Sequence, residues 1–432
     1  MAEGRATGGS TPTIGRRSFI GVGAASLVSA GVGFAVLLIA PRVLPNEVDV
    51  TDFLAFWSFL FLWFGILGGL SAESTRAVHD SDRRTEAAHE RREPRMLAVG
   101  LGVGIALGVV LSVSSLWWAP QVLGPDYAWL ALPLSASIAL FSGHAVIVGV
   151  LGGRLQWATF ARLVIGDSLL RLALIVGAAL VAATVAGLAV AASVASVTWL
   201  IGLAFSPTLR RAAAARSDVP LVPFLRRIGH ACLASGSSAV LVVGFPVILR
   251  LTSSEAAYEA AAGLLIAVTF TRAPLLIPLN AYQGVAIAHF LNNRHLGFRA
   301  LLPIARLIGV VAVVGAVLGG LLGPLLLGWY YGPGYVVDGW VVAGLVVAAA
   351  AMAMLTVTGA LCLALVRHRA FSAGGLAAWA LAVVVLLLPL DTGVRSVLAL
   401  LLGPLLGLGI HALALRRSRV VEKPPVVEGE QS

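Results

Sequence analysis

Long apolar segments separated by short polar stretches set the pattern of this chain. Each apolar segment has about 20 residues or more, the length that a helix rising 1.5 Å per residue needs to cross a bilayer core. Proline, glycine and charged residues mark the breaks between segments. The pattern predicts twelve membrane-spanning helices, at residues 18–40, 53–73, 96–117, 127–151, 157–182, 184–206, 229–252, 258–288, 300–328, 338–366, 370–390 and 394–415.

The composition agrees with this pattern. Hydrophobic residues make up 59% of the 432 residues and charged residues 12%, whereas soluble proteins carry about 25% charged residues. In lipid, every backbone amide must be paired within a helix or a closed barrel. A barrel alternates apolar and polar residues, and these segments are continuously apolar. We therefore predict an all-α polytopic membrane protein.

The net charge of +10 suggests a nucleic-acid partner until the charges are placed on the predicted topology. With the N-terminus in the cytosol, nearly all Lys and Arg residues fall in cytosolic loops, and the external loops hold only Arg42, Arg250 and Arg395. Cytosolic loops of membrane proteins carry this excess. The basic charge therefore indicates topology, with both termini cytoplasmic, and gives no reason to expect nucleic acid.

An internal repeat indicates two similar halves. The stretch from Arg42 to Glu47 matches the stretch from Arg250 to Glu255, and Gly124-Pro125-Asp126-Tyr127 matches Gly332-Pro333-Gly334-Tyr335. Both separations are 208 residues (250 − 42 and 332 − 124). Six helices per unit give both copies the same orientation, and parallel-repeat transporters place their substrate site between the halves near the midplane.

The repeat leads to a domain organisation with two six-helix lobes around a central cavity. The boundaries that we predict are a disordered cytosolic tail at 1–17, an N-terminal lobe at 18–206, an Arg-rich cytosolic linker at 207–228, a C-terminal lobe at 229–415 and a second disordered cytosolic tail at 416–432.

Some charged residues fall inside the apolar segments. A charge at the bilayer centre costs at least about 2.5–3.5 kcal/mol, so such residues should face a protein interior or a water-filled space. Asp167, Arg171 and Arg272 lie deepest. Arg162 and Arg306 lie nearer the cytosolic ends of their helices, where long side chains can reach the interface.

Two interpretations of the deep charges stay open. Asp167 and Arg171 are four residues apart on one helix, so they can form a structural ion pair. Alternatively, Arg171 and Arg272 form a cationic cavity wall, because the guanidinium fork matches phosphate oxygens and keeps its charge. Asp167 would then hold Arg171 while the site is empty, or exchange a proton during transport.

The predicted eighth helix has further polar features. Pro274 and Pro278 follow Arg272 and predict a kink. Asn280 and Gln283 add polar groups toward the cytosolic end. The second predicted helix is instead dense in aromatic residues, among them Phe53, Phe56 and Phe64, for which we expect packing toward lipid.

Several of these features resemble the polysaccharide flippases, in the superfamily that also contains multidrug and toxic-compound extruders. The resemblance rests on the twelve helices in two halves and on the stretches Ala40-Pro41-Arg42-Val43-Leu44, Thr271-Arg272-Ala273-Pro274 and Trp329-Tyr330-Tyr331-Gly332-Pro333-Gly334-Tyr335. The chain departs from the family at residues 284–289, which lack an expected proline. Its twelve helices also differ from the fourteen of the related lipid II flippases.

The resemblance implies a transporter that flips a polyprenyl-diphosphate-linked oligosaccharide across the plasma membrane by alternating access, without enzymatic activity or a cofactor. It also implies a positively charged central cavity. The implied partners are that lipid-linked glycan, membrane lipids and glycan-assembly enzymes. The candidate substrate-binding residues are Arg171, Arg272, Asp167, Arg162, Arg306, Asn280 and Gln283.

Two alternatives remain. A cation-coupled small-molecule exporter of the same superfamily would more naturally have an acidic cavity. A polyprenyl-phosphate-dependent membrane glycosyltransferase could use the acidic stretch Glu47-Val48-Asp49, but the short external loops leave little room for an acceptor. Cys232 and Cys362 lie in apolar segments without metal-ligand spacing, so we expect no metal site.

Overall fold

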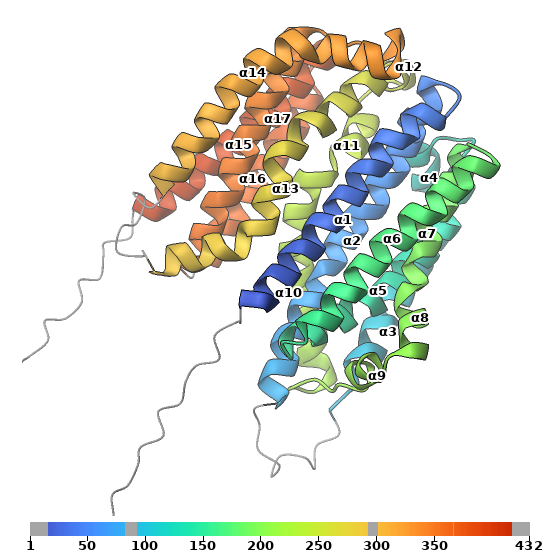
Figure 1. The fold of residues 1–432 in the computed structure, drawn as a ribbon, viewed down its shortest axis with the longest axis vertical. Helices are drawn as coiled ribbons and strands as arrows, with labels where there is room; N and C mark the ends of the chain where they lie inside the picture. The colour runs from blue at the N-terminus through green and yellow to red at the C-terminus, as the bar shows by residue number, and fades with distance from the viewer. Residues whose placement is uncertain (1–15, 83–92, 293–300, 366, 417–432) are drawn as a thin grey trace, which may run out of the picture.

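The structure is a computed structural model that describes residues 16–82, 93–292, 301–365 and 367–416. Figure 1 shows a bundle of long, roughly parallel helices with short connections at both ends. No strand occurs in the described residues, where one isolated bridge joins Arg95 and Arg216. The predicted tails fall almost wholly outside this range.

The first half of the chain forms the N lobe. Its elements, in chain order, are α1 (Arg16–Val43), α2 (Glu47–Asp82), α3 (Met96–Val113), α4 (Ser115–Leu123), η2 (Ala128–Leu130), α5 (Ala131–Gly153), α6 (Trp157–Val181), α7 (Val185–Val194), η3 (Ala195–Val197), α8 (Thr198–Phe205) and α9 (Pro207–Ala213).

The second half forms the C lobe. Its elements are α10 (Leu221–Val243), α11 (Phe245–Leu251), α12 (Glu255–Glu259), α13 (Ala262–Asn292), α14 (Leu302–Tyr331), η5 (Pro333–Tyr335), α15 (Gly339–Ala364), α16 (His368–Leu386) and α17 (Thr392–Arg416).

The predicted fold class is confirmed. Among the described residues, ten spans are long and apolar enough to cross a membrane, and α10 with α11 makes an eleventh if this pair, bent by 78°, counts as one. The remaining predicted segment corresponds to α13, whose Ala262–Leu276 portion is a shorter apolar helix. This helix continues through both prolines, and Figure 1 shows it turning aside toward its C-terminal end.

Helix boundaries follow the internal repeat. Gly124 and Gly332 both end a helix with positive φ, 89° and 108°, a backbone conformation that favours glycine. Other boundaries also recur after 208 residues, at the ends of α1 and α11 (Val43 and Leu251), the starts of α2 and α12 (Glu47 and Glu255), and the starts of α5 and α15 (Ala131 and Gly339).

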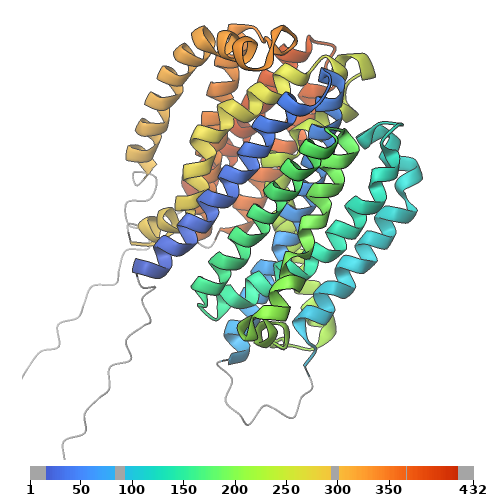
Figure 2. The same ribbon diagram turned by 45° about the vertical axis from the view of Figure 1, so that its right-hand side comes forward.

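The two lobes meet along a seam formed by α1 and α2 on one side and α10, α11 and α13 on the other (Figures 1 and 2). A Cβ added to Gly69 of α2 would lie 2.3 Å from the backbone nitrogen of Cys232 on α10. A Cβ added to Gly65 would lie 2.5 Å from the Cβ of Ala239. Glycines therefore allow the close approach of α2 and α10, as in other membrane helix pairs.

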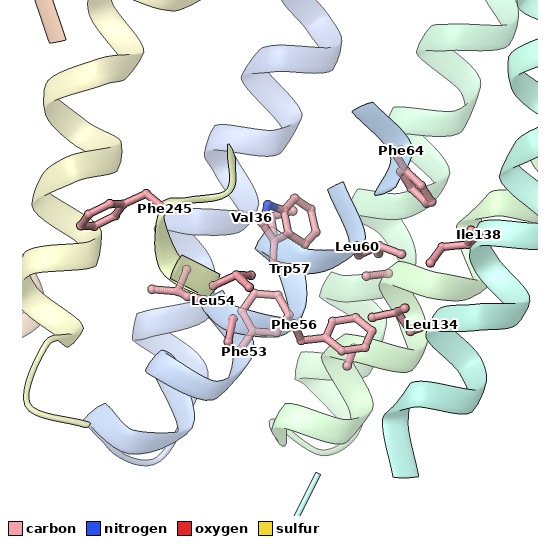
Figure 3. Packing of buried hydrophobic residues seen from close by; sticks show 14 of the residues in the cluster. Val36, Phe53, Leu54, Phe56, Trp57, Leu60, Phe64, Leu134, Ile138 and Phe245 are labelled. Atoms are coloured by element: carbon pink, nitrogen blue, oxygen red, sulfur yellow. The ribbon is translucent and has the colours of Figure 1, made fainter. Parts of the chain in front are cut away.

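The aromatic side chains of α2 lie in the core rather than toward lipid, so that prediction was wrong. Phe53 and Phe56 have at most 1% of their surface exposed, and Phe64 has 6%. Figure 3 shows Phe64 and Leu60 close to Ile138 of α5. Helix α2 contacts α10, α5 and α7, and neighbouring helices therefore cover the faces that we expected to meet lipid.

Candidate functional site

The deep charges of the N lobe form a buried ion pair on α6. Nη2 of Arg171 donates to Oδ2 of Asp167 over 2.9 Å, and Arg171 is only 3% exposed. Its guanidinium lies 5.4 Å and 5.3 Å from the ring centres of Phe61 and Phe64 on α2. A desolvated cation over aromatic rings gains about 2 kcal/mol or more. The pair therefore joins α6 to α2 inside the lobe.

Arg171 also donates to the backbone carbonyl of Ala192, in the last turns of α7. The 3-10 turn η3 follows α7 directly, before α8 continues the span. Carbonyls near a helix end need donors from outside the regular ladder, and a basic side chain can supply one. Arg171 thus stabilises an interrupted helix as well as binding Asp167.

His144 of α5 extends this cluster. Its ring stacks on Phe141, with centroids 5.2 Å apart, and Phe141 stacks on Phe64 at 3.8 Å. Nδ1 of His144 and Oδ1 of Asp167 are buried without a hydrogen-bond partner among the described residues. Burying polar atoms without a partner costs free energy, and these two atoms can each still form a further hydrogen bond.

Arg272 occupies a different setting in the C lobe. Its Nη1 donates to the carbonyls of Val242 and Leu241, at 3.1 Å and 3.5 Å. These carbonyls lie at the end of α10, directly before the 78° break to α11. From across the seam, the hydroxyl of Ser58 donates to the next carbonyl, that of Val243.

The charge of Arg272 is not neutralised by a carboxylate within the described part of the chain, where its partners are carbonyls. Its side chain is partly exposed. Helix α13 lies at the seam, and nearby Phe270 contacts Phe34 of α1 edge-to-face at 5.3 Å. Arg272 therefore places an uncompensated positive charge close to the other lobe.

The other predicted site residues are distributed apart from this position. Arg162 is exposed and donates to Ala158 of its own helix, and Arg306 is exposed on α14. Both positions suit side chains that reach the membrane surface. The side chains of Asn280 and Gln283 lie outside the described residues. No contact joins Arg171 to Arg272 in the residues that the structure describes.

Contacts across the seam gather at the predicted external end. Nη1 of Arg250 pairs with Oδ1 of Asp52 at 2.5 Å, and its guanidinium lies 4.9 Å from the ring centre of Tyr258. The hydroxyl of Tyr258 donates to the carbonyl of Thr51 over 3.1 Å. These contacts join α11 and α12 to the start of α2, and they hold the lobes together at this end.

The repeat supplies a second arginine at the same end. Arg42, which corresponds to Arg250, lies 4.6 Å from the ring centre of Tyr330 on α14. Each lobe therefore extends an arginine from the end of its first helix to the other lobe. The repeated motif was the sequence signal for both residues, although it did not indicate their partners.

At the predicted cytosolic end, Asp218 joins α2 to the segment before α10. Its two oxygens accept hydrogen bonds from Arg76 at 2.9 Å and 3.0 Å, and Arg227 of α10 donates to Oδ2 at 3.1 Å. Burial opposes ionisation of this carboxyl, but the bonds from Arg76 and the nearby charges outweigh it and lower its pKa.

Two cavities of the C lobe differ in character. The larger has a volume of about 480 Å³ and an apolar lining contributed mainly by α13, α14 and α15, with Leu38 of α1. The smaller has about 150 Å³ and is lined in part by Ser237, Ser238, Thr356 and His411.

Comparison with known proteins gives relatives along the whole chain, although no family model matches it. The uncharacterized protein Rv1510 of Mycobacterium tuberculosis is 38% identical over 418 residues, 96% of both chains. The uncharacterized protein Rv3630 of the same organism is 39% identical over 414 residues, 95% of both.

Solved structures show the fold. An inward-facing MATE-family multidrug transporter of the MOP superfamily aligns with a TM-score of 0.67 at 14% identity, over 91% of this chain and 94% of that one. The lipid II flippase MurJ, inward closed, aligns with a TM-score of 0.67 at 12% identity, over 92% and 87%. A MOP-superfamily transporter from Pyrococcus furiosus, described as having a binding pocket of reverse polarity, aligns at 0.62 and 14%, over 93% and 96%.

Proposed function

The chain belongs to one family with the mycobacterial proteins Rv1510 and Rv3630, and from this premise we propose that it is a membrane transporter that flips a polyprenyl-diphosphate-linked oligosaccharide. The fold shared with MATE transporters and with the lipid II flippase supports transport between two lobes. We propose that the protein lies in the plasma membrane, with both termini in the cytosol.

The observation that carries the substrate class is the uncompensated guanidinium of Arg272 beside the lobe seam. A cation inside a membrane protein, with carbonyls as its partners, still attracts an anion strongly because water is scarce there. A diphosphate offers oxygens that match the guanidinium fork. We therefore assign the first contact with the diphosphate to Arg272.

Arg171 is the second proposed contact, and its role depends on a change of partner. In this conformation its donors engage Asp167 and the Ala192 carbonyl. When the substrate's anion binds Arg171, it would have to replace Asp167. Asp167 therefore pairs with Arg171 only while the site is empty. Arg162, Arg306, Asn280 and Gln283 are proposed to contact the glycan or its phosphates as the substrate moves toward the cytosolic side.

Alternating access needs contacts that break at one end while others form. The Arg250–Asp52 pair closes the seam at the predicted external end, so this pair would have to break when that end opens. A cation-coupled small-molecule exporter remains the second candidate, because Asp167 and His144 have buried atoms that could bind a proton.

Transport of a fluorescent polyprenyl-diphosphate glycan into proteoliposomes, read by enzymatic modification of flipped glycan, tests the proposal. We expect flipping by the wild-type protein and loss with Arg272→Gln. Arg226→Gln, at an exposed arginine of α10 outside the proposed site, serves as the matched control. Flipping that is independent of the protein, or equal in both variants and wild type, contradicts the assignment. Export of a lipophilic cation instead would favour the second candidate.

A further inference from the structure

We infer that the apolar cavity of the C lobe binds the hydrocarbon chain of a polyprenyl phosphate. The inference rests on the proposed function and names where the substrate's chain lies. With about 480 Å³, the cavity has the volume of a typical ligand pocket. Ala267, Thr271 and Leu326 line it from α13 and α14.

The internal repeat shows how the cavity arises. In the N lobe, aromatic residues occupy the positions equivalent to three cavity-lining residues: Phe59 corresponds to Ala267, Trp63 to Thr271 and Trp118 to Leu326. The ring centres of Phe59 and Trp118 lie 4.9 Å apart, and those of Phe59 and Trp63 lie 6.2 Å apart. Rings occupy these positions in the N lobe, and smaller side chains occupy them in the C lobe.

The same change occurs along α14. Gly315 and Gly319 line the cavity at the positions that Leu107 and Leu111 occupy in the N lobe. Leu111 is only 7% exposed, and Leu107 packs against the buried core. Figure 2 shows α14 standing apart from α13 along much of its length. Smaller residues at these five lining positions therefore contribute to the open space between α13 and α14.

The surroundings indicate the occupant. The walls belong to membrane-spanning helices, so hydrocarbon is the material that reaches them, and it binds through close packing rather than through dehydration. At the external end Tyr330 lines the cavity, and the exposed guanidinium of Arg42 lies 4.6 Å from its ring centre.

The cavity also borders the seam, and this favours a polyprenyl chain over the acyl chains of bulk phospholipid. Leu38 of α1 closes it from the other lobe. Thr271 lines it and directly precedes Arg272, the proposed contact for the diphosphate. A headgroup at Arg272 and a chain in the cavity would therefore be adjacent.

Photolabelling of the purified full-length protein in nanodiscs tests the site. The probe is a polyprenyl diphosphate with a photoreactive group on its terminal isoprene unit, and labelled residues are mapped by mass spectrometry. We expect labels at residues such as Leu322 and Val346. Leu326→Trp and Ala267→Phe restore the ring pair of the N lobe and should each reduce this labelling about tenfold, because they fill the space that the chain needs.

Leu326→Trp keeps the test valid if Ala267→Phe does not fold, because Leu326 is 58% exposed. Leu321→Phe is the matched control on the same helix, 67% exposed and outside the cavity, and should leave labelling unchanged. Equal labelling of wild type, Leu326→Trp and folded Ala267→Phe overturns the site.

Two further results separate the inference from its premise. The first result concerns a phospholipid that carries the same photoreactive group. The choice of ligand is overturned if this phospholipid labels these residues and polyprenyl diphosphate does not displace it. If polyprenyl labelling is lost in the filled variants while the wild-type protein flips no glycan, the chain site stands and the proposed function fails.

Discussion

The ion pair between Arg250 and Asp52 should control how readily the predicted external end opens. Asp52→Asn removes the carboxylate charge and keeps the shape of the side chain. The pair is largely shielded from water, with 11% and 13% of the two side chains exposed. Because it joins the two lobes directly, its loss should favour the conformation in which they separate at this end.

The structure gives the size of this effect. Hydrogen bonds to charged groups contribute about 1.5–3 kcal/mol. Arg250 keeps its contact with the Tyr258 ring after the substitution, and the bond from Tyr258 to the Thr51 carbonyl also remains. The loss should therefore lie near the lower limit, and about 1.4 kcal/mol changes the ratio of open to closed molecules about tenfold.

Distances between spin labels provide the assay. Exposed Gln121 in the N lobe and Val336 in the C lobe take the labels after Cys232 and Cys362 are replaced. Double electron–electron resonance on protein in nanodiscs then reports the spread of distances at this end. We expect a longer-distance population that grows about tenfold relative to the closed one in Asp52→Asn.

Asp82→Asn is the matched control, because Asp82 pairs with Arg154 over 3.0 Å within the N lobe alone. Asp52→Glu keeps the charge and should restore much of the closed population. Identical distance distributions for Asp52→Asn and wild type would refute the reasoning, and so would an equal change in Asp82→Asn.

Three further predictions concern stability. Asp167→Ala leaves the buried charge of Arg171 without its partner and should lower the free energy of unfolding by about 3–5 kcal/mol, measured by thermal unfolding in detergent. The lowered pKa of Asp218 means that its stabilisation is present above about pH 4 and lost as pH falls further, so melting temperatures of wild type and Asp218→Asn should differ at pH 7 and converge in acid. Gly332→Ala should cost about 1–3 kcal/mol because its φ is 108°, whereas Gly409→Ala, in a helix with open space around it, should not destabilise.

The sequence was a good guide to spans, topology class and repeat, because apolar length and helix geometry are local properties. Each predicted span corresponds to one helix or to two or three adjoining helical segments. Gly124 and Gly332, which match each other in the internal repeat, both have a positive φ. The break at Gly244 was missed although Pro246 follows it, since glycine and proline also occur within unbroken membrane helices.

The site depends on contacts between distant segments, which spacing alone does not define. Asp167 and Arg171 share a helix face, so their pairing could be predicted from the sequence. The carbonyls that bind Arg272 lie beside the break between α10 and α11, which the apolar pattern did not predict. The apolar cavity of the C lobe depends on which faces Ala267 and Leu326 present to each other, and only the packed structure provides this.

The most direct test of the account is the affinity of Arg272 variants for charged and uncharged forms of one lipid. Competition between a polyprenyl diphosphate and the matching polyprenol, on purified protein, isolates the contribution of the anion. We predict that Arg272→Gln lowers the preference for the diphosphate about tenfold or more, since hydrogen bonds to charged groups contribute about 1.5–3 kcal/mol. Arg226→Gln, at an exposed arginine of α10 outside the proposed site, should keep it. An unchanged preference in folded Arg272→Gln would contradict the claim that this arginine binds the substrate's headgroup.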